Sequence, residues 1–203
     1  MNFNLDLFEK TEAKEFGEFT PLALGGHEIK ILEAGEHTSE FSGKTSLKIT
    51  VDIAGNDEQA GYFQKQYDEN PSADKKWSNG ATKYLSLADE QLAYLKGFIT
   101  SLEKSNVGYK FDPCGTWEQL KGLKIAGVFG LEEYQDQEGE VRTATKLVQF
   151  RSLDKLNDIK IPKVKLVDGT VMDYEDYKNR SNKNSSNDTV VVENLDDLLP
   201  FEL

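Results

Sequence analysis

The chain has 203 residues and a formal net charge of -12, with 37% hydrophobic and 30% charged residues. This length suits one well-buried domain with appendages and is short for two typical domains. No apolar run approaches the roughly 20 residues that a membrane-spanning helix needs, the first residues lack the pattern of a signal peptide, and Cys114 is the only cysteine. We therefore expect one domain in a reducing cytoplasm, without a membrane association.

After a leader at residues 1–20, the pattern predicts three strands. Residues 27–36 alternate isoleucine with charged residues, and residues 45–54 carry an aliphatic residue at every second position from Leu47 to Ile53. Residues 61–67 have an aromatic composition that favours a third strand, paired in a hairpin with the second. A long polar loop and the extended-looking residues 82–85 follow.

One helix and two further strands are expected next. In residues 88–104, leucine and isoleucine recur at helical spacing. Residues 123–134 and 141–152 are predicted strands around the turn-rich residues 135–140. Three strands, one helix and two strands is the order of the five-stranded OB barrel, so we predict a mainly β, OB-type fold (β-β-β-α-β-β) at residues 21–172.

The C-terminal part changes character. Residues 178–187 contain no apolar side chain, and they lead into a short acidic and hydrophobic segment. Such a composition cannot bury enough apolar surface to offset the entropy of ordering. We predict a flexible linker and acidic partner-docking tail at residues 173–203.

Aromatic residues interleaved with lysines are the strongest functional signal. Single strands are held by stacking bases on aromatic rings, at about 1–3 kcal/mol per base, while Lys and Arg follow the phosphates. The expected DNA-binding residues are Lys44, Lys48, Tyr62, Lys65, Tyr67, Lys75, Lys76, Trp77, Lys83, Tyr84, Tyr134, Arg142, Lys146 and Arg151. Residues 141–167, with seven basic and two acidic residues, are a further candidate for phosphate contact.

Each member of this set also has a plainer explanation. Phe63 and Tyr84 suit a hydrophobic core, and lysines are common on solvated faces. Trp77 is the sharpest candidate, because it sits between a lysine pair and Asn79-Gly80 in a predicted loop. Its alternative is a ring that caps the barrel.

The sequence gives no support for catalysis. His27 and His37 stand near opposite ends of a predicted strand, without a cysteine pair or carboxylate at ligand spacing, so no metal site is expected. There is no Gly-rich phosphate loop, EF-hand loop or nucleophile elbow, and Cys114 has no identifiable base beside it. We expect a non-enzymatic protein without cofactors.

The tail resembles the acidic tip of bacterial single-stranded DNA-binding proteins, where aspartates precede an apolar residue and a Pro-Phe end. The matching residues are Asp196, Asp197, Leu198, Leu199, Pro200 and Phe201. Segments of the body, such as Gly61-Tyr62-Phe63 and Lys96-Gly97-Phe98-Ile99, look like phage replication-module proteins of the same class. The chain departs from the bacterial pattern by continuing to Glu202-Leu203.

This resemblance implies an OB fold, sequence-tolerant coating of single-stranded DNA in phage replication, recombination or repair inside a bacterial host, and a tail that recruits replication or recombination proteins. A homodimer is a further expectation, because small barrels often enlarge their DNA footprint in that way. The main alternative is an acidic adaptor or anti-host protein that acts through protein contacts without binding DNA. A nuclease or other enzyme is third.

Overall fold

The computed structural model describes residues 20–187 of the chain. In chain order the strands and α-helices are β1 (Gly25–Thr38), β2 (Thr45–Ile53), α2 (Tyr62–Glu69), β3 (Thr82–Ser86), α3 (Leu92–Ser105), β4 (Lys124–Gln135), β5 (Val141–Arg151), β6 (Val164–Lys165), β7 (Val171–Met172) and α4 (Tyr174–Asn187). Short 3-10 turns are η1 (Asn79–Ala81), η2 (Asp89–Gln91), η3 (Trp117–Leu120) and η4 (Leu153–Asp158). None of the helices in this part of the chain has the length and apolar character needed to cross a membrane.

The first two strands confirm the period-two pattern. β1 and β2 pair antiparallel, with Ile29 opposite Ile53 and Ile31 opposite Val51. Every aliphatic residue from Leu47 to Ile53 at the alternating positions of β2 is buried. Successive strand residues point to opposite faces, so the residues between them are directed away from the core.

The predicted strand at residues 61–67 is wrong, because this segment forms helix α2. Its start depends on a carboxylate from β2. Asp52 Oδ1 accepts hydrogen bonds from the backbone N–H groups of Ile53 at 2.8 Å and Phe63 at 3.0 Å. Phe63 is buried in the core, and Gly61 (φ 68°) supplies the left-handed conformation that turns the chain into the helix.

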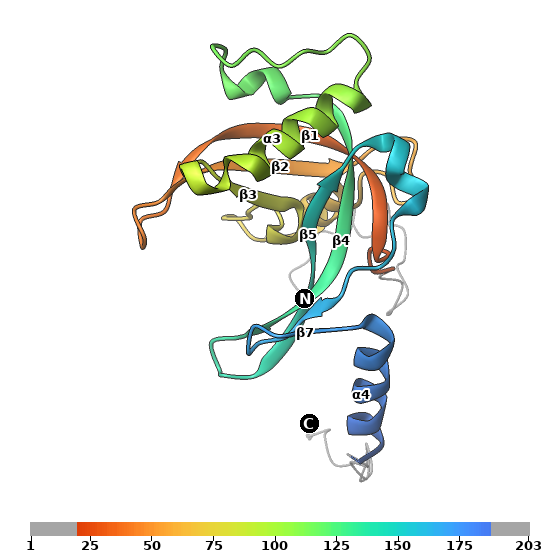
Figure 1. Cartoon of the computed structure of the whole chain (residues 1–203). Helices are drawn as coiled ribbons and strands as arrows, with labels where there is room; N and C mark the ends of the chain where they lie inside the picture. Colours follow the sequence, from red (N-terminus) through yellow and green to blue (C-terminus); the bar gives the residue numbers. More distant parts are fainter. Residues whose placement is uncertain (1–19, 188–203) are drawn as a thin grey trace, which may run out of the picture.

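The third strand is therefore β3, which pairs with β2. Helix α3 follows and packs Phe98 and Leu102 into the core. β4 and β5 form the expected hairpin, with Tyr134 opposite Arg142. In Figure 1 this hairpin and the β1–β2 hairpin project toward the same side of the molecule.

The sheet is mixed and open, with seven strands in the order β3-β2-β1-β4-β6-β7 and β5 paired to β4 beside this path. β6 pairs with β4 in the parallel direction. Within residues 20–187, no ladder of hydrogen bonds joins β3 to β5, so the sheet is not a closed barrel. The mainly β prediction is confirmed, and two short strands that it did not include extend the sheet.

The segment predicted as a linker begins at residue 173, and its described part contains a helix. Residues 174–187 form α4, which extends away from the sheet in Figure 1. Glu175 and Asp176 lie in its first turn, where negative charge favours a helix N-terminus. The Tyr177 hydroxyl lies 2.8 Å from that of Thr143, which ties the helix to β5. Residues 188–203, which include the predicted docking tail from Asp196 to Phe201, lie outside the described residues.

Candidate nucleic-acid interface

A groove of about 530 Å³ lies on the face of β1 and β2 that points away from the core. Because Ile49 and Val51 point inward, Lys48 and Thr50 face this groove. We call it the aromatic groove, and its lining residues are Leu32, Glu33, Ala34, Lys48, Thr50, Tyr67, Lys75, Trp77, Glu118 and Lys121.

One wall of the aromatic groove is formed by a cation and two aromatic rings in contact. The Lys75 ammonium lies 4.6 Å from the centroid of the Tyr67 ring. The Tyr67 and Trp77 rings are 5.7 Å apart at an interplanar angle of 38°. Such contacts between a cation and an aromatic face hold both side chains in place.

Trp77 is half-buried, and it both packs against the core and lines the aromatic groove. Its indole N–H donates a hydrogen bond to the Val51 carbonyl at 3.2 Å, and its ring packs against the core. It also lines the aromatic groove. The loop before β3 is therefore anchored by the same residue that offers an aromatic surface.

Tyr84 continues this face toward the free edge of β3. It stands opposite Lys48 in the β2–β3 ladder, and residues opposite each other in a ladder share one face. The residue is 47% exposed, and its ring centroid lies 5.3 Å from that of His37. Lys48, His37 and Tyr84 thus extend the surface from the aromatic groove to the sheet edge.

Two lysines pair with one carboxylate, and a third lysine on a fourth strand lies within electrostatic range of them. Glu132 of β4 pairs with Lys165 of β6 at 2.5 Å and with Lys146 of β5 at 3.1 Å. Lys83 of β3 is close enough for all three charges to act on it. We call Lys83, Lys146, Lys165 and Glu132 the lysine cluster.

The environment of the lysine cluster changes the pKa of two of its members, Lys83 and Glu132. Burial lowers the pKa of Lys83, the charges of Lys165 and Lys146 lower it further, and Glu132 opposes them. The hydrogen bond from Lys165 is the main reason that the pKa of Glu132 lies below its ordinary value.

Several expected residues lie elsewhere. Tyr62 and Lys65 line a separate depression of about 380 Å³ that contains Glu58 and Glu69. Arg142 is paired with the carboxylates of Asp136 and Glu140 at the end of the β4–β5 hairpin, where Tyr134 is also exposed. The two cations in these places, Lys65 and Arg142, therefore lie beside acidic residues.

The remaining expected residues are at the surface. Lys44 and Lys76 are exposed, in the β1–β2 hairpin and beside Trp77 respectively. Arg151 lines a third depression, of about 740 Å³, between β3, α3 and β5, together with Tyr94 and Phe98.

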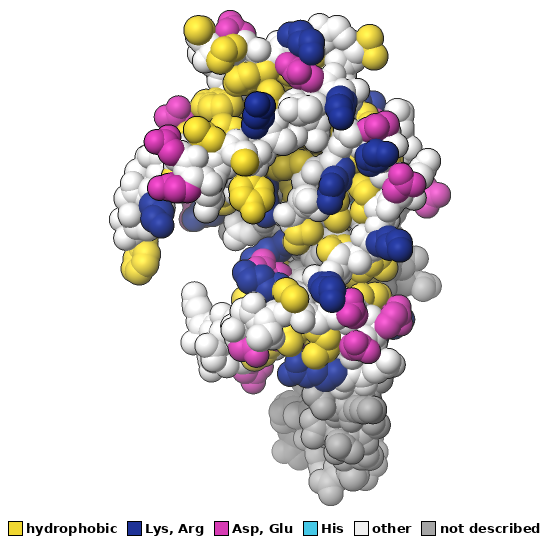
Figure 2. All heavy atoms as spheres, in the orientation of Figure 1, with side chains coloured by type: hydrophobic (Ala, Val, Ile, Leu, Met, Phe, Trp, Pro, Cys, Tyr) yellow, Lys and Arg dark blue, Asp and Glu magenta, His cyan; other side chains and the backbone are white. Residues whose placement is uncertain are grey.

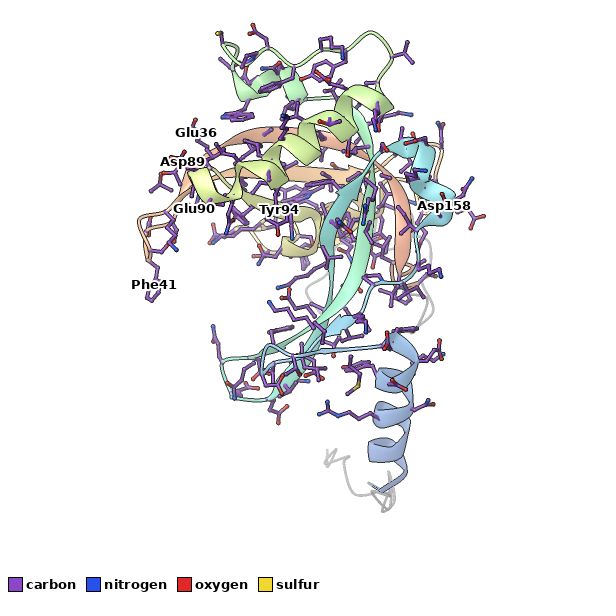
Figure 3. The ribbon with its side chains drawn as sticks, viewed as in Figure 1. Glu36, Phe41, Asp89, Glu90, Tyr94 and Asp158 are labelled. Carbon is purple, nitrogen blue, oxygen red and sulfur yellow. The ribbon has the colours of Figure 1, made fainter. Side chains whose placement is uncertain are left out.

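Two residues of the candidate interface, Phe41 and Lys121, were not predicted from the sequence. Phe41 is fully exposed at the tip of the β1–β2 hairpin and points away from the body in Figure 3. An aromatic residue in an otherwise polar turn, Glu40-Phe41-Ser42-Gly43, is the signal that could have found it. Lys121 carried no such signal, because its place in the aromatic groove depends on how η3 packs against β1.

Figure 2 shows lysine and arginine side chains on the concave side between the two hairpins. Among residues 20–187, no group of three or more His, Cys, Asp or Glu residues is arranged to hold a metal ion. No known family model matches the sequence. No curated protein matches it either.

Proposed function

We propose that this protein binds single-stranded DNA without strong sequence preference and without catalysis. The observation that carries the proposal is the aromatic groove, where Tyr67 and Trp77 lie beside Lys48, Lys75 and Lys121. Stacking accepts any base because every base has a π-face, while the lysines follow the phosphate backbone. The five side chains come from four separate segments of the chain, and folding brings them to one face.

The strand connections support an OB-type domain, which we propose as the finer description of the fold. β1 pairs with β2 and β4, β2 pairs with β3, and β5 pairs with β4. Helix α3 lies between β3 and β4 in the chain. In OB folds the face of strands two and three, with the loops joining strands one to two and four to five, binds oligonucleotides.

Binding by this face makes sense of the two hairpins. Phe41 in the turn of the β1–β2 hairpin and Tyr134 near the end of the β4–β5 hairpin are exposed aromatic residues. We propose that the single-stranded DNA enters the aromatic groove and passes Tyr84, with one hairpin on each side of it. The acidic tail, which lies outside the described residues, is proposed to recruit replication or recombination proteins.

The test is fluorescence anisotropy of labelled oligo-dT against a matched duplex, with Lys75→Glu as the first variant. Reversing this charge is expected to weaken oligo-dT binding about fivefold, close to 1 kcal/mol. The loss of one phosphate contact is expected to reduce the slope of log affinity against log salt by about 0.7.

Lys96→Glu is the matched control. Lys96 is an exposed residue of α3 that lines none of the three depressions. If Lys75→Glu and Lys96→Glu bind oligo-dT equally well, the aromatic groove is not part of the DNA interface. If the unmodified chain does not bind oligo-dT even at low salt, the proposal is refuted.

The second candidate, an adaptor that works through protein contacts, is favoured by one surface. Tyr94 and Leu92 of α3 are 75% and 44% exposed, and Tyr94 borders the depression between α3, β3 and β5. Exposed aromatic and aliphatic side chains beside a depression are typical of docking sites. This candidate predicts no DNA affinity, and the same titration separates the two.

A further inference from the structure

The lysine cluster has more positive charge than the structure neutralises. The Glu132 carboxylate, which is 21% exposed, forms ion pairs with the ammonium groups of Lys146 and Lys165, and Lys83 lies within the electrostatic range of all three charges. In a chain of net charge -12, this is a local excess of two positive charges. Like charges held together raise the free energy of a site unless an anion joins them.

Within the described part of the chain, Lys83 is the cluster member for which no partner is found. Among residues 20–187 its ammonium group makes no hydrogen bond or ion pair, although the residue is half-buried. Lys165 donates a hydrogen bond to Glu132, Lys146 forms an ion pair with it, and an ammonium group has three N–H donors. The cluster therefore has spare donors on all three lysines.

We propose that the lysine cluster binds a phosphate group, and that Glu132 holds Lys146 and Lys165 in position while competing with that phosphate for their N–H donors. A phosphate oxygen at Lys83 would supply its missing partner and balance the excess charge. Charge-assisted hydrogen bonds of this kind are about twice as strong as neutral ones.

The position of the cluster points to a phosphate of the nucleic-acid backbone, a step that rests on the proposed function. Lys83 and Tyr84 are consecutive on β3, so they point to opposite faces of this edge strand. Tyr84 belongs to the face that continues the aromatic groove. A single strand that crosses the free edge of β3 can stack a base on Tyr84 and place a phosphate at Lys83.

The decisive pair of variants changes the cluster charge in opposite directions. The double variant Lys83→Gln/Lys165→Gln is expected to weaken oligo-dT binding about tenfold and to reduce the salt slope by about 1.4, two contacts at about 0.7 each. Glu132→Gln is expected to strengthen binding about threefold, since it removes the competitor. A purely structural role for Glu132 predicts weaker or unchanged binding instead.

Lys96→Gln is the control for the lysine substitutions, and thermal unfolding by circular dichroism verifies that each variant folds. Inorganic pyrophosphate provides a second probe. Its titration, followed by backbone amide NMR, is expected to shift the signals of residues 83, 132, 146 and 165, and to leave them unshifted in the double variant.

The two probes separate the proposals. Oligo-dT binding that is unchanged in the double variant, with no pyrophosphate shifts, overturns the phosphate site and leaves the proposed function standing. Pyrophosphate binding at the cluster without oligo-dT binding by the unmodified chain supports the phosphate site, assigns it to free phosphates and overturns the proposed function. Absence of both overturns both.

Discussion

Gly80, just before β3, allows the chain to approach β5 closely. A Cβ atom placed on Gly80 would stand 2.6 Å from the Thr145 carbonyl oxygen and 3.3 Å from Ser78 Oγ. The first distance is well inside van der Waals contact, and its partner is backbone that cannot rotate away. Gly80 is thus the point where the loop carrying Trp77 reaches the neighbouring strand.

We expect Gly80→Ala to lower the free energy of unfolding by about 1–3 kcal/mol, the usual cost of overpacking. Gly97→Ala is the matched control, because a Cβ there meets nothing within 4 Å and alanine favours a helix by up to about 1 kcal/mol over glycine. Urea unfolding of both variants measures the difference. Equal stabilities would mean that the β3–β5 approach is loose.

At the scale of elements, α2 depends on a carboxylate eleven residues earlier in the chain. Asp52 is 8% exposed and accepts from two backbone N–H groups. Removing it leaves these donors without a partner, at about 1–3 kcal/mol each. The same helix carries Tyr67 of the aromatic groove, so its start positions the candidate site.

We expect Asp52→Ala to lower the free energy of unfolding by about 2–4 kcal/mol. Asp52→Asn is expected to lower it by less than half as much, because the asparagine amide oxygen can still accept the two backbone hydrogen bonds. Urea unfolding compares them, and amide NMR signals of residues 62–69 report on the helix. An alanine variant as stable as the native chain would exclude the capping role.

How far the sequence predicts these elements depends on the range of the interactions. The strict alternation of β2 is local, and each inward residue is buried as expected. The aromatic composition of residues 61–67 favours a strand, yet Asp52 and the burial of Phe63 select a helix. α4 has no apolar pattern to reveal it, and the contact of Tyr177 with Thr143 comes from the fold.

In the candidate site, too, the features set by local sequence could be predicted, and those set by contacts between distant segments could not. Lys83 and Lys146 were predicted as basic residues near DNA, but their meeting at Glu132 depends on strand register. Lys146 stands opposite Gly130 and Lys165 opposite Glu132, and no local pattern specifies either pairing. Tyr67, Lys75 and Trp77 were close in sequence and do lie together.

For the whole molecule, the net charge of -12 opposes binding to a polyanion, so the placement of charge matters more than its sum. The last sixteen residues contain no basic residue, and their acidic residues are Asp188, Glu193, Asp196, Asp197 and Glu202. If the chain binds single-stranded DNA as proposed, these five carboxylates are expected to repel the phosphates of the incoming DNA and to compete with them for the lysines of the aromatic groove.

We expect a chain ending at Asn187 to bind oligo-dT about two- to fivefold more tightly at low salt, with the difference disappearing near 1 M salt, where charges are screened beyond about 3 Å. A full-length chain with the five acids changed to amides is expected to match it, because only charge is removed. Anisotropy titrations at several salt concentrations compare the three chains. If truncation alone tightens binding, the tail hinders DNA by occupying space; if neither change has an effect at low salt, the tail does not oppose binding at all.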